Sequence, residues 1–180
     1  MLSPPCSRRS LEYPVTAQSV LGGVWLACHE GNADVVHWLI QAGQLDAEDL
    51  VSDGNRAVRW AAANNHLPLA RWLVDTFPPL GECNLGRMNN NQMIRTACRL
   101  GHLEVAKWVT ETYHLDKWDA RVMDDYALCY ACEGGHADVV EWLIDRFELQ
   151  PEDAVGCAYL ARRNGHSLLA DRVAAFVARA

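Results

Sequence analysis

The sequence of 180 residues predicts an all-α solenoid, in which about five helix-turn-helix repeats stack side by side. The first observation is a segment that recurs five times, from EGNADVVHWLI near the start to NGHSLLADRVA near the end. The second is its spacing, because the Gly or Asn of each copy, here called the turn residue, recurs in steps of 34, 36, 34 and 30 residues. The turn residues are Gly31, Asn65, Gly101, Gly135 and Gly165. A period near 34 is typical of stacked repeats, which mostly present extended surfaces to partners.

The first helix of each repeat is predicted from small and apolar residues ahead of the turn. An alanine stands four residues before every turn residue, and an apolar residue stands three residues before that alanine. This spacing places both on one buried helix face, where the alanine permits close helix contact. The alanines are Ala27, Ala61, Ala97, Ala131 and Ala161, and their upstream partners are Val24, Val58, Ile94, Leu128 and Ala158.

A second helix is expected after each turn. The turn Gly or Asn can adopt the left-handed conformation that ends a helix, and a short polar turn then reverses the chain. Asp34, Glu104 and Asp138 lie in the first turn of the predicted second helix. A carboxylate is stabilising there because it is near the positive end of the helix dipole. Apolar residues such as Val139 and Leu143 follow at the spacing of one helix face. Each repeat is therefore predicted to be a helical hairpin.

The block LGHLEVAKWV at 100–109 and the AlaCys…GlyHis…Val…TrpLeu pattern around 131–143 resemble the ankyrin repeat. The resemblance covers roughly residues 20–177, and the recurring Trp resembles a variant common in amoebae, oomycetes and giant DNA viruses. The prolines and the Ser-Arg-Arg among the first residues predict a flexible lead-in at 1–17. One repeat domain is expected at 18–180, with repeats near 20–50, 51–87, 88–121, 122–150 and 151–180. The Asp-x-x-Gly-x-Thr-Pro-Leu-His start of the family is absent from all five copies, which makes its β-hairpin fingers doubtful in this chain.

The connections are expected to begin helices instead of fingers. Helix starts are predicted at 52–54, 89–91, 124–125 and 151–153, where Ser, Asn, Asp or Pro-Glu-Asp stand. The longest connection, at 77–91, contains prolines and glycines and predicts a surface loop, either reaching a partner or serving as a mobile linker.

Composition limits the kinds of partner. The formal net charge of −7 argues against nucleic acid or an anionic membrane as the main partner. No stretch approaches the roughly 18 consecutive apolar residues of a membrane helix, and the first twenty residues contain no apolar run typical of a signal peptide. Seven cysteines without a disulfide-type spacing suggest free thiols in a reducing compartment. We therefore expect a cytoplasmic protein without a small-molecule substrate.

One cysteine motif has the residue types of a zinc site. Cys129, Cys132 and His136 lie close in sequence, with a similar Cys98 and His102 one repeat earlier. Cys132, however, occupies a position that is small in other repeats, so packing is the preferred interpretation and no metal or cofactor is expected. A zinc-dependent or redox-active protein is the weakest of the hypotheses that we keep.

Histidine and tryptophan each recur once per repeat. The histidines are His66, His102, His136 and His166, and the tryptophans are Trp38, Trp72, Trp108 and Trp142. Catalysis needs one constellation and not four equivalent ones, and no nucleophile recurs with the histidine, so no enzyme is predicted. The family resemblance implies that the histidines are structural, with ring nitrogens bonded to backbone groups of adjacent repeats. The tryptophans are predicted to pack between neighbouring second helices, with a partner-facing role as the alternative. The last repeat replaces the Trp with Arg172, which suits the polar outer face of an end repeat.

Residues that differ between repeats are the candidates for partner binding. The resemblance implies that exposed positions of the first helices and the connecting loops form a concave binding side. One row contains Trp25, Arg59, Arg95, Cys129 and Tyr159, and the next contains His29, Ala63, Arg99, Glu133 and Arg163. Arg, Trp and Tyr are enriched at binding hot spots. The adjoining connections are acidic, with Asp46, Glu48, Asp49 and Asp53, and then Asp116, Asp119, Asp124 and Asp125.

These features predict a non-catalytic protein–protein interaction module, an adaptor or scaffold. Its arginine-rich face, centred on Arg59, Arg95 and Arg99, would suit an acidic or mixed-charge protein segment that carries apolar anchors. One alternative is a structural subunit that is built into a larger assembly through the Trp edge and the end repeats. The family resemblance also allows a viral or microbial effector that engages host proteins.

Overall fold

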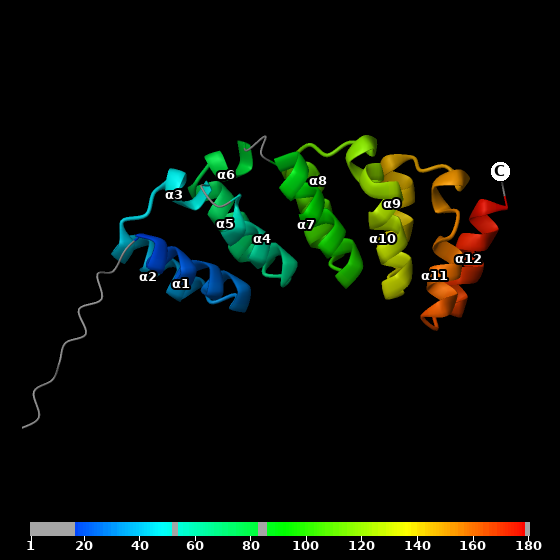
Figure 1. Ribbon diagram of the computed structural model, residues 1–180, viewed down its shortest axis with the longest axis horizontal. Coiled ribbons are helices and arrows are strands. Elements are labelled where there is room, and N and C mark those ends of the chain that lie inside the picture. The colour runs from blue at the N-terminus through cyan, green and yellow to red at the C-terminus, as the bar shows by residue number, and fades with distance from the viewer. Residues whose placement is uncertain (1–16, 52–53, 83–85, 179–180) are drawn as a thin grey trace, which may run out of the picture.

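A computed structural model describes residues 17–51, 54–82 and 86–178 of the chain. Within these residues every regular element is a helix and none is a strand. The helices form pairs that stack side by side along the long axis of the molecule (Figure 1). The prediction of an all-α solenoid is therefore confirmed. The predicted lead-in at 1–17 lies almost wholly outside the described residues.

Each of the five pairs joins a first helix to a second helix through a tight turn. The first helices are α1 (Ala17–Glu30), α4 (Arg56–Ala63), α7 (Gly86–Leu100), α9 (Lys117–Gly134) and α11 (Cys157–Arg163). The second helices are α2 (Ala33–Gly43), α5 (Leu67–Thr76), α8 (Leu103–Thr112), α10 (Ala137–Phe147) and α12 (Ser167–Val177). Successive first helices pack directly on one another, and each also packs on the second helix of its own pair.

The core follows the small-residue pattern of the first helices. All five alanines four residues before the turn are buried, from Ala27 to Ala161. Their apolar partners are buried in the first four pairs, whereas Ala158 in the last pair is half-buried. Small side chains allow the first helices to approach closely, so the stack buries a continuous core that no single pair could form alone.

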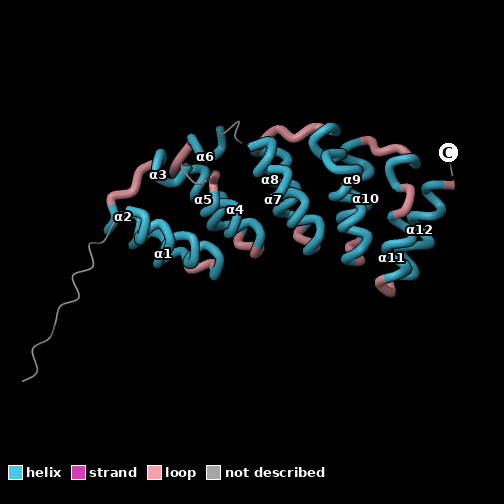
Figure 2. Tube along the Cα trace, viewed as in Figure 1, coloured by secondary structure: helices cyan, strands magenta, loops and turns pink. Residues whose placement is uncertain are grey.

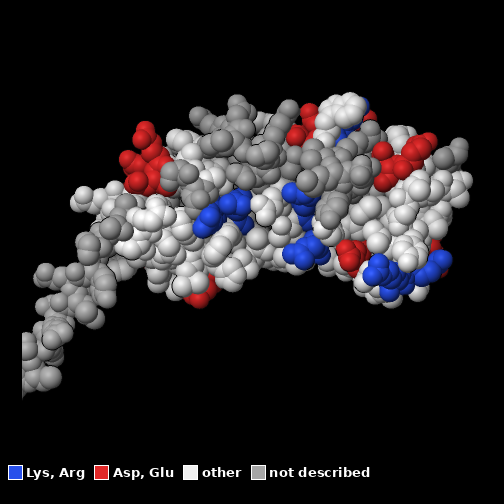
Figure 3. All heavy atoms as spheres, in the orientation of Figure 1, with Lys and Arg blue, Asp and Glu red and all other residues white. Residues whose placement is uncertain are grey.

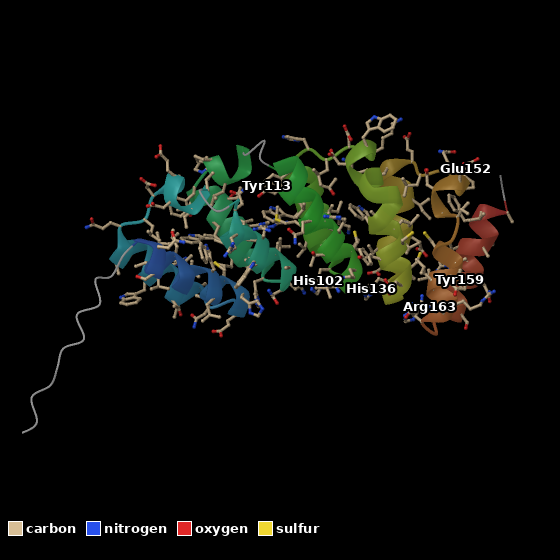
Figure 4. The ribbon with its side chains drawn as sticks, viewed as in Figure 1. His102, Tyr113, His136, Glu152, Tyr159 and Arg163 are labelled. Carbon is tan, nitrogen blue, oxygen red and sulfur yellow. The ribbon has the colours of Figure 1, made fainter. Side chains whose placement is uncertain are left out.

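The turns contact each other through a histidine and a glycine. Gly101 has a φ of +72°, and a Cβ added to it would lie 2.4 Å from Nδ1 of His136 in the following pair. Nε2 of His136 donates a hydrogen bond to the carbonyl of Arg99 (3.1 Å), and Nε2 of His66 donates to the carbonyl of His29 (3.1 Å). Figure 4 shows His102 and His136 at this edge of the stack. The ring of one repeat thus lies on the turn of the previous repeat.

The opposite edge carries the connections between pairs, which contain short helices (Figure 2). These are α3 (Ala47–Val51), α6 (Pro79–Glu82) and the 3-10 helix η1 (Pro151–Ala154). Reciprocal bonds begin α3: the backbone N–H of Asp49 donates to Oδ1 of Asp46 (3.0 Å), and the N–H of Asp46 donates to Oδ2 of Asp49 (3.2 Å). The same capping arrangement begins α9 and η1.

Two of the predicted helix starts are wrong. Residues 89–91 lie inside α7, which begins at Gly86, and 124–125 lie inside α9, which begins at Lys117. The physical reason at α9 is an earlier cap, because Asp116 accepts from the backbone N–H groups of Trp118 (2.8 Å) and Asp119 (3.1 Å). The start at 151–153 agrees with η1, and 52–53 lie outside the described residues.

The predicted surface loop at 77–91 is also corrected. It contains α6 and the beginning of α7, and Leu80 in α6 is fully buried. The carbonyl of Leu80 accepts from Nδ2 of Asn55 (3.1 Å) and from the hydroxyl of Tyr113 (3.2 Å). This segment is therefore anchored to the second and third pairs.

Candidate protein-binding surface

The first-helix face is defined by the side chains two, five and six residues before each turn residue. In the row two residues before the turn, His29, Arg99, Glu133 and Arg163 are exposed and Ala63 is half-buried. In Figure 3, arginine side chains gather over α4 and α7 and again near the C-terminal end. Figure 4 shows Tyr159 and Arg163 together on α11. This face is therefore basic in a chain whose net charge is −7.

The row six residues before the turn is less exposed than the sequence predicts. Tyr159 is 68% exposed, but Trp25, Arg59, Arg95 and Cys129 are half-buried. The guanidinium of Arg56 lies 4.4 Å from the centre of the Trp25 ring. These four side chains therefore belong partly to the packing of the stack.

Arg59 is held in place by two hydrogen bonds. Its Nε donates to the carbonyl of Gly54 (2.9 Å), and its Nη1 donates to Oε1 of Gln92 on α7 (2.9 Å). Both partners belong to the stack itself, so Arg59 links α4 to α7 as well as facing the surface. A charge reversal at this residue would disturb packing as well as binding.

The row five residues before the turn was missed by the sequence analysis. It contains Leu26, Trp60, Thr96, Tyr130 and Leu160. Leu26 is 55% exposed and the others are half-buried. The Trp60 ring meets His29 edge to face, with centroids 5.5 Å apart. This row could have been predicted from the sequence, because it lies three residues before the His29 row. Residues i and i+3 share a helix face, as residues i and i+4 do.

A hollow of about 220 Å³ opens on this face between α4 and α7. Its lining residues are Arg59, Trp60, Ala63, Gln92, Met93 and Thr96. Ala63 leaves space beside the Trp60 ring, and buried Met93 lies at the hollow as an apolar contact. Pockets for small ligands usually exceed about 300 Å³, so this volume suits a single apolar side chain. A guanidinium and an amide stand beside it to bind polar groups.

Carboxylates gather along the edge that carries the connections (Figure 3). Asp46, Glu48, Asp116 and Glu152 are exposed there. Asp119 is buried and Asp49 is half-buried because each caps a helix, so these two carboxylates contribute less to the exposed acidic edge. Asp53 and the side chains of Asp124 and Asp125 lie outside the described residues.

This acidic edge also exposes an aromatic ring that the sequence analysis missed. Trp118, at the start of α9, is 65% exposed, and Nζ of Lys117 lies 5.4 Å from its ring centroid. Asp116, two residues earlier in the same connection, is an exposed carboxylate. An exposed Trp among charged groups is a second candidate contact for a partner.

The recurring tryptophans do not behave alike. Trp108 is 7% exposed, and Trp72 and Trp142 are half-buried, each meeting an aromatic ring five residues later. Trp38 is 65% exposed, so the packing prediction is wrong for this ring. In the first pair, the residue five positions after the tryptophan is Gly43 in place of an aromatic residue. A Cβ added to Gly43 would lie 2.8 Å from Val20, and the glycine has no side chain for the Trp38 ring to contact. In the fifth pair Arg172 reaches Glu141 of α10 in an ion pair.

The cysteines of the first helices are mainly packing residues. Cys28, Cys98 and Cys132 are buried. Burial raises the pKa of the Cys28 thiol from 9.0 to about 12, and it raises the pKa of Cys98 further, because a thiolate is poorly solvated there. Among the residues that the structure describes, no three His, Cys, Asp or Glu side chains are grouped so that they could hold a metal ion.

Comparison with known proteins agrees with the repeat pattern. The family model for ankyrin repeats, in three copies, matches residues 24–119, which is just over half of the chain. The palmitoyltransferase AKR1 of Debaryomyces hansenii is 37% identical to this chain over 59 residues. That stretch is 33% of this chain and 7% of the yeast protein, so the chain spans only a small part of this relative. In the described part of the chain, no helix combines the length and the apolar character needed to cross a membrane.

Proposed function

We propose, because this chain belongs to the ankyrin repeat family, that it is a non-catalytic module that binds a partner protein through its first-helix face and the adjoining acidic edge. The family resemblance assigns the first-helix face to the concave side of the stack. The observation that carries the proposal is the hollow between α4 and α7, with its Trp60 wall and the Arg59 and Gln92 side chains beside it. It lies among side chains that differ from repeat to repeat, as a specific site requires.

The chemistry of the face indicates the kind of partner. An apolar side chain fits the hollow, and exposed Arg99 on α7 is available to pair with a carboxylate near that anchor. The acidic edge on the other side disfavours a partner segment that is acidic throughout. We therefore propose a partner segment of mixed charge with one apolar anchor, a carboxylate toward Arg99 and a basic group toward the acidic edge.

The recurring histidines support a non-catalytic role. Nε2 of His66 and Nε2 of His136 each donate to a backbone carbonyl of the previous repeat. A general base needs a ring nitrogen directed at a substrate proton. The histidines therefore serve the contact between repeats. The side chains that differ between repeats remain as the candidates for partner binding.

Two substitutions test the binding face. Ala63→Arg fills the hollow, and Arg99→Glu reverses an exposed charge. Arg71→Glu is the matched control, since Arg71 is exposed on the second helix α5. Arg59 is left unchanged because it also links α4 to α7.

The measurement is quantitative mass spectrometry of proteins captured from native lysate by the intact chain and by each variant, all shown by circular dichroism to be folded. We expect a set of proteins that Ala63→Arg and Arg99→Glu both lose and Arg71→Glu retains. If all three variants capture the same proteins as the intact chain, the first-helix face is not the binding surface.

An obligate structural subunit is the second candidate, favoured by exposed apolar surface on the second helices. Trp38 is 65% exposed, and a groove of about 320 Å³ lies between α10 and α12. Analytical ultracentrifugation of the purified chain tests this function. Self-association or aggregation that Trp38→Lys relieves would support it, whereas a monomer with no loss of solubility would leave the binding module as the better account.

A further inference from the structure

Two thiols from neighbouring repeats lie close together. Sγ of Cys129 on α9 is 3.0 Å from Sγ of Cys157, the first residue of α11. Cys129 is six residues before its turn residue, and Cys157 is eight residues before its own. The corresponding pairs in the three earlier interfaces are Trp25 with Ala57, Arg59 with Met93, and Arg95 with Ala127. The last interface therefore differs from the others in placing a thiol at both positions.

We propose that Cys129 and Cys157 are a modification site at which a reversible disulfide joins the fourth and fifth repeats. A disulfide has an S–S distance of about 2.05 Å, so the two sulfurs need to approach by about 1 Å to form the bond. Helices α9 and α11 already pack directly on each other. The bond therefore forms within the existing helix arrangement.

The oxidant is a small-molecule disulfide, such as oxidised glutathione. Cys129 is half-buried and Cys157 is buried, so the reagent reaches Cys129 first. The Cys129 thiolate attacks the reagent, forms a mixed disulfide and releases one reagent thiol. Cys157 then loses its proton and attacks Sγ of Cys129, which breaks the mixed disulfide and releases the second reagent thiol. The protein loses two electrons and two protons, and the reagent is reduced to two thiols.

The other described thiols are poorer sites for this reaction. Cys28, Cys98 and Cys132 are buried in the first helices. The thiolate is the attacking species, and burial raises the pKa of Cys28 and of Cys98 well above the ordinary value. Cys132 is on the same helix as Cys129 but is fully buried. Position and access thus both favour Cys129 as the reacting thiol.

The bond would secure the fifth pair on the fourth. Among the described helices, α11 packs on one neighbouring first helix, α9, whereas the first helices of the middle pairs pack on two, so the fifth pair unfolds locally more easily. Helix α11 carries Tyr159 and Arg163, two exposed residues of the first-helix face. The cross-link would hold them at a fixed place relative to α9, whether or not they bind a partner.

Peptide mapping of the full chain tests the proposal. The folded protein is incubated with oxidised glutathione, alkylated and digested with trypsin. We expect peptide 122–146 to be joined to peptide 147–162, with the mass of two hydrogens lost. The yield should be roughly tenfold higher from the folded chain than from the chain in urea, since folding raises the effective concentration of one thiol at the other.

Three variants identify the bond, because peptide 122–146 contains both Cys129 and Cys132. Cys132→Ala should keep the linked peptides, whereas Cys129→Ala and Cys157→Ala should each abolish them. Alanine is the natural residue at the equivalents of Cys132 and Cys157 in the second repeat, Ala62 and Ala57, so these variants should fold.

Hydrogen exchange gives an independent measurement. We expect exchange in α11 and α12 to slow on oxidation and to recover after dithiothreitol. The proposal is overturned if glutathione remains on Cys129 while Cys157 is alkylated, if the link uses another cysteine, or if it forms equally well in urea.

Discussion

Replacing Gly101 with alanine tests how the turns hold neighbouring repeats together. Gly101 has a φ of +72°, and an added Cβ would lie 2.4 Å from Nδ1 and 2.6 Å from Cε1 of His136. Gly165 is the matched position in the fifth repeat, with a φ of +89° and no atom of the described residues within 4 Å of an added Cβ. The two glycines therefore share the left-handed backbone and differ in the ring that lies on them.

The expected losses of stability differ because only one variant disturbs a histidine. An alanine in the left-handed region costs about 1–2 kcal/mol, which both variants share. At Gly101 the His136 ring must also move, which removes a hydrogen bond worth about 0.5–1.5 kcal/mol and adds overpacking of about 1–3 kcal/mol. We expect Gly165→Ala to lower the free energy of unfolding by about 1–2 kcal/mol and Gly101→Ala by about 2.5–6.5 kcal/mol. The lower entropy of the unfolded chain offsets about 0.4–1 kcal/mol in both variants and cancels in the comparison.

Urea unfolding followed by far-UV circular dichroism measures both values. A double-mutant cycle with His136→Ala isolates the contact, because the added Cβ of Gly101→Ala meets no ring in the double variant. We expect a coupling energy of more than about 1 kcal/mol between the two sites. Equal losses in the two glycine variants, or an additive cycle, would refute the role that we assign to this contact.

Three further predictions concern the second helices, the histidines and the caps. Trp108→Ala should destabilise the chain by about 3–5 kcal/mol because the ring is buried, whereas Trp38→Ala should change stability by less than about 0.5 kcal/mol, both measured by urea unfolding. Burial, and then the charge of His136, lower the pKa of His102 below 6.5. The folded state therefore favours the neutral ring, and this stabilisation is present above about pH 6.5 and lost as the pH falls through the lowered value. Urea midpoints across this range should fall less steeply in His102→Gln, and an unchanged slope would contradict the assignment. Asp116→Ala should cost about 0.5–2 kcal/mol, since its side chain caps α9, and a thermal midpoint equal to that of the intact chain would argue against this cap.

Sequence predicts the parts of this fold that repeat. Every repeat must contact the next in the same way, so residues such as Ala27 and Ala61 recur at the same helix position and reveal the buried face. The sequences of the connections do not recur. Their structure depends on local hydrogen bonds and packing, which cannot be predicted from the repeat period. The Asp116 cap and the buried Leu80 are two such features, and both changed the predicted boundaries.

The candidate site was harder to predict because exposure depends on neighbours outside the helix concerned. Trp38 has the same sequence context as Trp108, yet it remains exposed because Gly43 stands where Tyr113 supports Trp108. The contact between Cys129 and Cys157 joins different positions of adjacent repeats, so alignment of equivalent positions cannot reveal it. Such contacts depend on how far one helical pair is shifted along the next. The repeat period in the sequence does not determine that shift, whereas the three-dimensional structure does.

The hollow between α4 and α7 lies where one repeat has a smaller side chain than the other repeats at the equivalent position. Two residues before the turn, the repeats carry a His, Arg or Glu in four copies and alanine in the second copy, at Ala63. A long side chain at that position would cover the groove between α4 and α7, whereas alanine leaves it open beside Trp60. The small residue therefore does at the surface what Ala61 does in the core, since both leave space for another group. In the core that group is the next helix, and at Ala63 we infer that it is a side chain of the partner.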